Sequence, residues 1–500
     1  ANDKTPNISK DMEFKESYGV DDSWKNMSWY ANIDYNYRNL YFAQVAMSLE
    51  SSSRFGENAD GLSLGGVKWA YYPSVQLGWA ISNEKWFPKT SALNYFLLKA
   101  GYDITGNDDI NNYAARTSFQ VMQYLNNTSA HMLNNIGNDK ITYEKTGQWN
   151  VGFKSYLLNN RLGVDFNYYQ KHTTNLLTLK TFENPVAGIN NYWSNGGSMD
   201  NQGFEVTVTT KPVVSKDFNI ELGASVGHYE NKIKTLPNDD KLYVDGVKNA
   251  QGYTSSIYGT DNIATIVGQP VGSFYGYKTA GVFATDAQAK AAGNNDYLYY
   301  LDETGAKQYF KAGDMHFVDI NKDGKIDEAD KTIIGNPNPD IYGNIFGSVM
   351  WKNFTLTLGL NYSLGNDVYN YSRSVLESGS NFYNQTIAMA NRWRHEGQVT
   401  DMPRLSYGDP MGNARFSDRW IEDGSYLRLK TVNISYKVPV KGDWIQGLTI
   451  WAEANNLFTI TKYLGSDPEF SAANGVLYQG IDPGNVALSR TFTFGMKSNL

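Results

Sequence analysis

The sequence has no cysteine among its 500 residues. This absence excludes disulfide bonds, thiolate zinc sites and cysteine nucleophiles. No run of about 18 apolar residues is present, which excludes a transmembrane helix. Basic residues are not in excess, and the formal net charge of −7 argues against a nucleic-acid partner. The first residues, ANDKTPNISKDMEF, lack the pattern of a signal peptide, so we expect any export signal to lie upstream.

Charged residues and proline are also scarce, whereas aromatic residues and glycine are abundant. Only 19% of the residues are charged, against the usual quarter of a soluble domain, and 14 are proline. Aromatic residues make up 14% of the chain, and 46 residues are glycine. The mean hydropathy is nevertheless −0.49. This balance is typical of long β-strands that have one polar face and one apolar face.

Alternation of apolar and polar residues predicts about thirteen β-strands. The stretch FTLTLGLNYSLG, which begins at Phe354, is a clear example. Strict alternation indicates that the two faces of each strand meet different surroundings. The predicted strands cover residues 28–39, 40–53, 68–82, 92–105, 145–158, 161–173, 201–212, 218–230, 341–352, 354–365, 426–439, 448–458 and 490–500.

Two all-β architectures fit the alternation, and strand length separates them. Strands of soluble sandwiches and propellers run about five or six residues, whereas many segments here run to ten or more. Tilted strands of that length cross a bilayer. Short connections, as at 157–163 and 214–219, alternate with long ones, as at 107–143 and 363–425. The pattern favours a transmembrane antiparallel β-barrel with long extracellular loops.

Several stretches resemble signature motifs of SusC/RagA-type TonB-linked outer-membrane transporters, and they occur in that family's order over residues 65–500. The clearest is DRWIEDGSYLRLKTVNISYKVP at 418–439. The others are at 77–87, 98–110, 143–177, 194–210, 313–344, 455–470 and 488–500.

The resemblance implies a plugged outer-membrane barrel, which in this class has about 22 strands. It further implies a SusD-like lipoprotein lid on the extracellular mouth and energy from the TonB complex through the plug. The imported nutrients would be oligosaccharides or peptides. The protein would cross the bacterial outer membrane many times and contact lipid and lipopolysaccharide.

The chain is interpreted as residues 28–500 of a C-terminal barrel part, preceded by an N-terminal segment or loop at 1–27. No plug domain, TonB box or signal peptide is recognisable in the sequence. An open sheet cannot sit in lipid because its edge N–H and C=O groups would be unpaired. We therefore expect the N-terminal half of the barrel to come from the same polypeptide or from a separate chain. A smaller, self-closed barrel is the alternative, and Leu500 departs from the aromatic end usual in such barrels.

One loop resembles a calcium site. The stretch DINKDGKID matches the EF-hand order, with Gly324 at the sharp turn, but an aspartate replaces the glutamate expected at the last ligand position. Flanking helices are not expected, because prolines follow closely. The predicted site is a structural Ca²⁺ brace, and the alternative is an Asp/Asn/Gly turn that satisfies its own backbone without metal. The predicted ligands are Asp319, Asn321, Asp323, Lys325 through its carbonyl, Asp327 and Asp330.

The sequence predicts no enzyme. It has five scattered histidines and no phosphate-binding loop. The stretches GSYL at 424–427 and GSM at 197–199 are not nucleophile elbows, which require G-x-S-x-G on a strand–helix turn. Aromatic and amide side chains in the loops at 191–197, 294–303 and 380–385 suit contacts with sugars, although the substrate-binding residues remain unidentified. The alternatives to import are a non-transporting outer-membrane barrel for adhesion or loop display, and a hydrolase embedded in a barrel.

Overall fold

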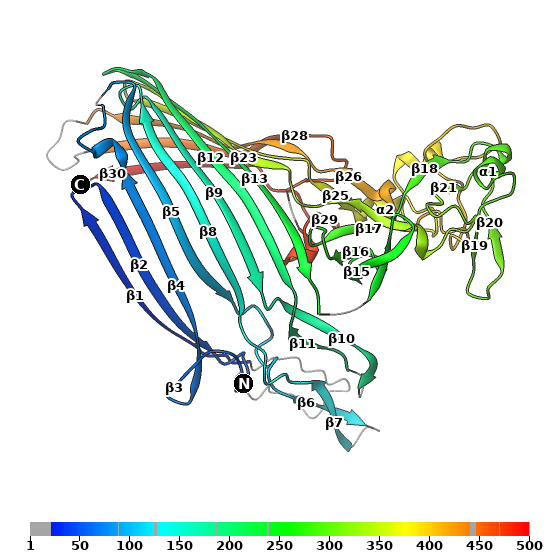
Figure 1. Ribbon diagram of the computed structural model, residues 1–500. Helices are drawn as coiled ribbons and strands as arrows, with labels where there is room; N and C mark the ends of the chain where they lie inside the picture. Colours follow the sequence, from blue (N-terminus) through cyan, green and yellow to red (C-terminus); the bar gives the residue numbers. More distant parts are fainter. Residues whose placement is uncertain are drawn as a thin grey trace, which may run out of the picture. The chain divides into compact units, whose positions relative to one another are not determined.

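The computed structural model describes residues 22–88, 90–124, 128–186, 189–237, 240–440, 447–469 and 471–499. Long antiparallel strands dominate them (Figure 1). Thirteen strands, with the short β3 (Leu62–Leu64) beside β4, are hydrogen-bonded to one another in chain order. They are β1 (Asn26–Tyr37), β2 (Tyr41–Ser52), β4 (Val67–Ala80), β5 (Leu93–Asn107), β8 (Glu144–Leu157), β9 (Leu162–Thr174), β12 (Ser198–Val214), β13 (Phe218–Thr235), β23 (Ile341–Trp351), β24 (Phe354–Leu364), β27 (Tyr426–Val438), β28 (Gly447–Thr461) and β30 (Thr491–Asn499).

These strands confirm the thirteen segments predicted from alternation, one for one. The first begins at Asn26, two residues before the predicted start. Residues 1–21 of the predicted N-terminal segment, and Leu500, lie outside the described residues. The predicted short turns and long connections are also found.

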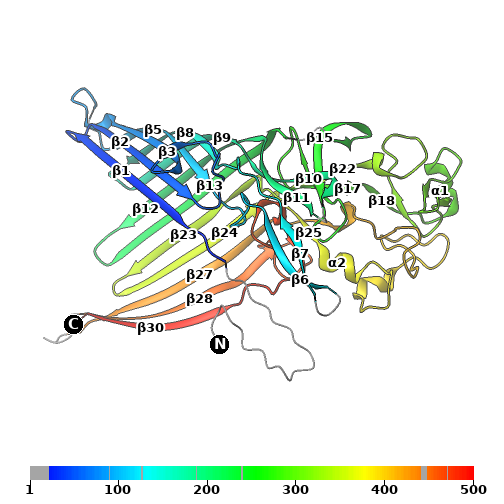
Figure 2. The same ribbon diagram turned by 90° about the horizontal axis from the view of Figure 1, so that it is seen from below.

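Contacts divide the chain into two compact units. Unit 1 comprises Ala1–Gly78, Ala100–Trp149 and Lys171–Ser198. Unit 2 comprises Trp79–Lys99, Asn150–Gln170 and Met199–Leu500. Within unit 2, the strands from β12 to β30 lie side by side (Figure 1, Figure 2).

One face of the unit 2 sheet is apolar. Its residues form rows, each made of the residues that lie opposite one another on neighbouring strands. The register places Leu358 opposite Gly347 on one side and Val432 on the other. Because side chains alternate along each strand, every second row lies on the same face. Three of these rows are Leu222–Gly347–Leu358–Val432–Ala454–Phe492, Ile220–Val349–Leu356–Ile434–Ala452–Phe494 and Phe218–Trp351–Phe354–Tyr436–Ile450–Met496.

The opposite face of the same strands is polar. Between the first two apolar rows lies the row Glu221–Ser348–Thr357–Asn433–Glu453–Thr493. Its members hydrogen-bond across strands. The amide of Asn433 in β27 donates to Glu453 Oε2 in β28 at 3.0 Å, and Asn455, two residues further along β28, donates to Glu453 Oε1 at 2.9 Å. The sheet therefore separates an apolar surface from a hydrogen-bonded polar one, as the alternation predicts.

The long loops carry secondary structure of their own, which alternation did not reveal. Unit 2 holds a five-stranded sheet, a three-stranded sheet that includes a parallel pair, and two two-stranded sheets. Its loop strands are β14 (Lys241–Val244), β15 (Val247–Ser255), β16 (Ile263–Ile266), β17 (Ser273–Tyr277) and β22 (Lys331–Gly335); β25 (Asp367–Asn370), β26 (Ile421–Asp423) and β29 (Ile481–Asp482); and β18 (Thr279–Val282), β21 (Met315–Phe317), β19 (Tyr299–Leu301) and β20 (Lys307–Tyr309).

The remaining elements are short. Unit 1 has the hairpins β6 (Ser118–Tyr124) with β7 (Thr128–Asn135) and β10 (Leu177–Val186) with β11 (Ile189–Asn195). The helices are α1 (Asp286–Ala292), α2 (Tyr371–Leu376) and the 3₁₀ turns η1 (Ile81–Asn83), η2 (Glu328–Asp330), η3 (Ile387–Asn391), η4 (Asp418–Trp420) and η5 (Val476–Tyr478). No helix in the described ranges is both long enough and apolar enough to cross a membrane.

The loops of unit 2 also contain its hydrophobic cores. One core gathers Phe283, Leu298, Phe310, Met315, Phe317 and Ile326. A second packs Phe274, Tyr369 and Ile481 around Trp420, which is fully buried. These loops are therefore folded, packed structures that can hold side chains in fixed positions.

Candidate functional site

The six predicted calcium ligands lie in one tight loop between β21 and β22. The Asp319 carboxylate closes its first half: Oδ1 accepts hydrogen bonds from the Lys322 and Asp323 amides, and Oδ2 accepts one from the Gly324 amide at 2.7 Å. Gly324 has a φ of 81°, as the predicted sharp turn requires. Asp323 Oδ1 accepts from the Lys325 amide, and Asn321 Oδ1 accepts from that of Asp323.

The second half of the loop is anchored by Asp330, which is fully buried. Its carboxylate accepts hydrogen bonds from the Ile320 amide at 2.8 Å and the Asp327 amide at 2.9 Å. Asp327 in turn caps η2 by accepting from the Ala329 amide. Burial raises the pKa of Asp330 to about 6, against the pull of these hydrogen bonds. The last predicted ligand is therefore also the residue that ties the two ends of the loop together.

The loop braces the first hydrophobic core. Ile326, at the apolar position of the motif, is 2% exposed and packs into that core. The carboxylates mostly accept backbone hydrogen bonds, as a metal-free turn would require. Among the described residues, no group of three or more histidine, aspartate or glutamate side chains is placed to hold a metal ion. Amide and backbone oxygens can also ligate calcium, so calcium binding stays a prediction.

A buried carboxylate that sequence reasoning missed fixes two other loop segments. Asp314 is fully buried and accepts hydrogen bonds from Arg404 Nε at 2.8 Å and Nη2 at 3.0 Å. The amide of Asn413, itself 2% exposed, donates to the same carboxylate at 3.0 Å. The Lys311 backbone amide donates to it at 2.9 Å. About ninety residues separate Asp314 from Arg404, so no local sequence signal predicts the pair.

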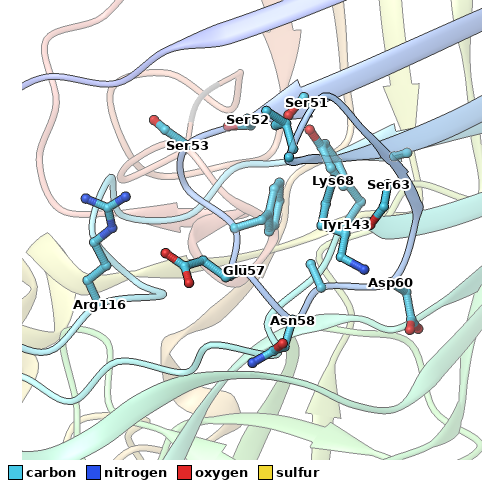
Figure 3. Close-up of a pocket in the computed structure, with 16 residues that line it drawn as sticks. Ser51, Ser52, Ser53, Glu57, Asn58, Asp60, Ser63, Lys68, Arg116 and Tyr143 are labelled. Atoms are coloured by element: carbon cyan, nitrogen blue, oxygen red, sulfur yellow. The ribbon is translucent and has the colours of Figure 1, made fainter.

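Unit 1 has a polar cavity of about 470 Å³ beside the end of β2 (Figure 3). Its wall includes Glu57, Lys68 and Arg116, and no ion pair among the described residues joins these three. The Tyr143 hydroxyl is buried there, with no hydrogen-bond partner in the part of the chain that the structure describes. Burial raises the pKa of Tyr143, and the Asp108 charge adds to the effect. The cavity has the polarity to take a small hydrophilic ligand.

The three loop stretches predicted to suit sugars differ in exposure. Phe382 is 90% exposed and stacks on Tyr407, with ring centroids 4.9 Å apart. In the stretch 294–303, by contrast, Tyr297 and Tyr299 pack against the ring of Tyr309. In the stretch 191–197, Trp193 packs against a small core of unit 1. Of the three stretches, 380–385 thus presents the most open aromatic surface.

The histidines are not gathered into a catalytic arrangement in the described structure. His316 is half-buried and stacks on Phe283, and burial lowers its pKa. His228 Nδ1 makes a 2.6 Å hydrogen bond with the carbonyl of Asp340. Both contacts are structural. The side chain of His131 lies outside the described residues.

No protein-family model matches the sequence. Among curated proteins, TonB-dependent receptor P3 of Formosa agariphila is 27% identical over 490 residues, which cover 94% of this chain and 45% of the relative. TonB-dependent receptor SusC of Bacteroides thetaiotaomicron is 28% identical, covering 94% of this chain and 43% of the relative. This chain is similar to TonB-dependent receptors of the SusC type. The resemblance predicted from the ordered motifs is confirmed.

The SusC-like fold is also found among solved structures. The RagAB peptide transporter matches with a TM-score of 0.72 at 22% identity, over 95% of this chain and 48% of that one. The likeness confirms the predicted fold class, which is all-β with long antiparallel strands. The chain spans about half the length of the curated relatives it matches. Those relatives are named as receptors and not as enzymes.

Proposed function

We propose that this chain is part of an outer-membrane, TonB-dependent importer of the SusC type. The observation that carries the proposal is the similarity to curated TonB-dependent receptors along 94% of the chain. The chain would supply part of the barrel wall and the extracellular loops. The rest of the barrel, the plug and the contact with the TonB complex would come from the N-terminal half, in the same polypeptide or in another chain. No enzymatic step is proposed.

The apolar face of the unit 2 sheet supports a place in the outer membrane. Its rows run over nine residues of β13, from Phe218 to Val226. Nine to eleven tilted residues are about what a strand needs to cross a bilayer. The row nearest the short turns is mostly aromatic, and Phe354 lies 4.5 Å from Tyr436, ring centre to ring centre. Aromatic girdles at the membrane interface have this character. The apolar face would contact lipid, and the ends beside the loops would contact lipopolysaccharide.

We infer the partner and the substrate of this chain from its similarity to the named relatives. SusC-type similarity favours a SusD-like lipoprotein lid over the loops. The substrate would be an oligosaccharide or a peptide, and the RagAB structure is described as that of a peptide transporter. The exposed Phe382–Tyr407 pair favours one alternative, a barrel that displays its loops for adhesion without transport.

The composition of the native complex tests the proposal. The complex would be purified from outer membranes in mild detergent, and every component weighed by mass spectrometry. We expect a plug-bearing polypeptide, either the parent of this chain or a partner, together with a lipoprotein. A lone polypeptide of 56.1 kDa without either component would refute the importer and favour display.

We also propose that Ca²⁺ occupies the loop from Asp319 to Asp330 as a structural ion. A ligand at one hundred times its dissociation constant stabilises the folded state by about 2.7 kcal/mol. We therefore expect chelation to lower the melting temperature of the loop core, and Ca²⁺ to restore it better than Mg²⁺. Asp323→Ala should abolish the response, whereas Asp302→Ala, in another aspartate turn of unit 2, should leave it intact. A melting temperature that changes with neither chelator nor Ca²⁺ would favour the metal-free turn.

A further inference from the structure

The loops of unit 2 enclose a second cavity, of about 490 Å³, whose lining is rich in aromatic rings. It is assembled from five separate segments of the chain, among them the β15–β16 turn, β17 and the start of α2. Its floor is buried: Tyr275, Tyr277, Tyr369 and Trp420 are each at most 8% exposed. Tyr258 and Tyr371 lie at its rim, and we call the cavity the Tyr258 pocket.

The turn that carries Tyr258 has an unusual backbone. Tyr258 has a φ of 53° and Asp261 a φ of 49°, in the left-handed region that bulky residues seldom occupy. The fully buried Asn262 holds the turn closed: its amide donates to the Ile257 carbonyl at 2.8 Å, and its oxygen accepts from the Ile257 amide at 2.9 Å. Such a conformation costs free energy and persists where surrounding structure enforces it, often at ligand sites.

A second clamp fixes the same turn. The Tyr369 hydroxyl donates a 2.9 Å hydrogen bond to the Tyr258 carbonyl. The Tyr258 ring lies 4.9 Å from that of Tyr371, centre to centre, and the Tyr258 side chain keeps 43% of its surface exposed. The turn thus holds an aromatic ring rigidly at the mouth of the pocket, where it can contact a ligand at little cost in side-chain entropy.

Two carboxylates, those of Asp261 and Glu328, also line the pocket. Asp261 Oδ1 accepts hydrogen bonds from Thr254 and Ser256, which orient the carboxylate, and no hydrogen bond to its Oδ2 is found among the described residues. Glu328, 67% exposed at its side chain, is 2.9 Å from Lys331 Nζ. At the floor, Lys331 and Arg415 both make cation–π contacts with the ring of Tyr277. Acidic groups at the rim disfavour an anionic ligand, and cations at the floor disfavour a cationic one.

We propose that the Tyr258 pocket binds one ring of a neutral saccharide. A sugar ring has apolar C–H faces and hydroxyl groups at its edge. The Tyr258 ring would cover one face, and the Asp261 and Glu328 carboxylates would accept hydrogen bonds from hydroxyls. The volume suits a small organic ligand. The assignment rests on the proposed function and deepens it by naming a saccharide subsite in the loops.

Hydrogen exchange of the native complex tests the pocket directly. The complex would be kept in lauryldimethylamine oxide, because alkyl-glycoside detergents would compete for a sugar site. The probes are maltohexaose, cellohexaose, xylohexaose and laminarihexaose, with a mixed decapeptide pool as comparison. We expect at least one hexasaccharide to slow amide exchange over residues 256–262, and the peptides to leave it unchanged.

Two substitutions at Tyr258 separate binding from folding. Tyr258→Gly removes the ring and suits the positive φ, so the turn should survive while the saccharide binds about tenfold more weakly. Tyr258→Phe keeps the ring and should bind within about twofold of the parent. Equal protection in the glycine variant, protection by peptides alone, or no protection by any of the four saccharides would overturn the proposal. Energised uptake by whole cells is measured separately. Protection of residues 256–262 without uptake would contradict the importer and support the saccharide pocket. Uptake without protection would support the importer and contradict the saccharide pocket.

Discussion

Leu358→Arg is expected to lower the free energy of unfolding from a bilayer by about 2–4 kcal/mol, the cost of a basic residue at the midplane of a barrel's lipid face. Leu358 lies in the middle of β24, in an apolar row that continues through Gly347 on one neighbour and Val432 on the other. Rows on both sides of it are apolar as well. A charge there could not reach the polar face, because the pleat directs the side chain outward.

The adjacent residue provides the control. Thr357 belongs to the polar row, between Ser348 and Asn433, so Thr357→Arg should change the stability in the membrane by less than about 1 kcal/mol. Both variants would be made in the intact native polypeptide, and urea titration in lipid vesicles would measure unfolding. Equal effects of the two substitutions would contradict the assignment of the faces.

Asp314→Ala is expected to destabilise the loop cores by about 2–4 kcal/mol. The substitution removes a fully buried carboxylate that receives two bonds from Arg404 and one from the buried Asn413. The Asn413 amide would be left in the interior without a partner, which is the costly outcome. Arg404 would lose less, because 36% of its side chain is exposed and can be hydrated.

Limited proteolysis and hydrogen exchange over residues 278–330 would measure that effect. The long strands of the main sheet should keep their protection, because the lost contacts lie within the loops. Glu303→Ala, an exposed carboxylate in the same region, should change little. Unchanged protection of the loops in the Asp314 variant would show that the contacts of Asp314 with Arg404 and Asn413 do not stabilise these loops.

The long strands of the main sheet could be predicted from sequence because one face of each strand is apolar and the other is polar. In β24, each apolar residue such as Leu356 or Leu358 alternates with a polar or small one, and this period of two is legible without any knowledge of the partner strand. The loops give no such signal. In the three-stranded loop sheet, β25 pairs in parallel with β29, about 110 residues later, and only the folded chain brings the two together.

The candidate sites divide in the same way. The six predicted calcium ligands are close together in the sequence, so their order alone predicted that they share one loop. Their order does not show whether a metal binds there. The Tyr258 pocket draws on segments spread over about 160 residues. Its defining feature, a tyrosine with positive φ held by Asn262, is a property of the backbone that side-chain identity does not reveal. Sequence motifs therefore predicted the similarity to SusC-type receptors and the fold class, while the geometry of the pocket required the structure.

Energy-dependent uptake by cells would show whether the chain belongs to a TonB-dependent importer. Cells that produce the intact native complex would be given fluorescent oligosaccharides and peptides, with and without functional TonB and with and without a proton uncoupler. The account predicts accumulation of at least one ligand inside the cells that stops when TonB or the proton gradient is lost, while binding at the surface continues. Uptake that is unchanged without TonB, or surface binding with no uptake under any condition, would contradict a TonB-dependent importer.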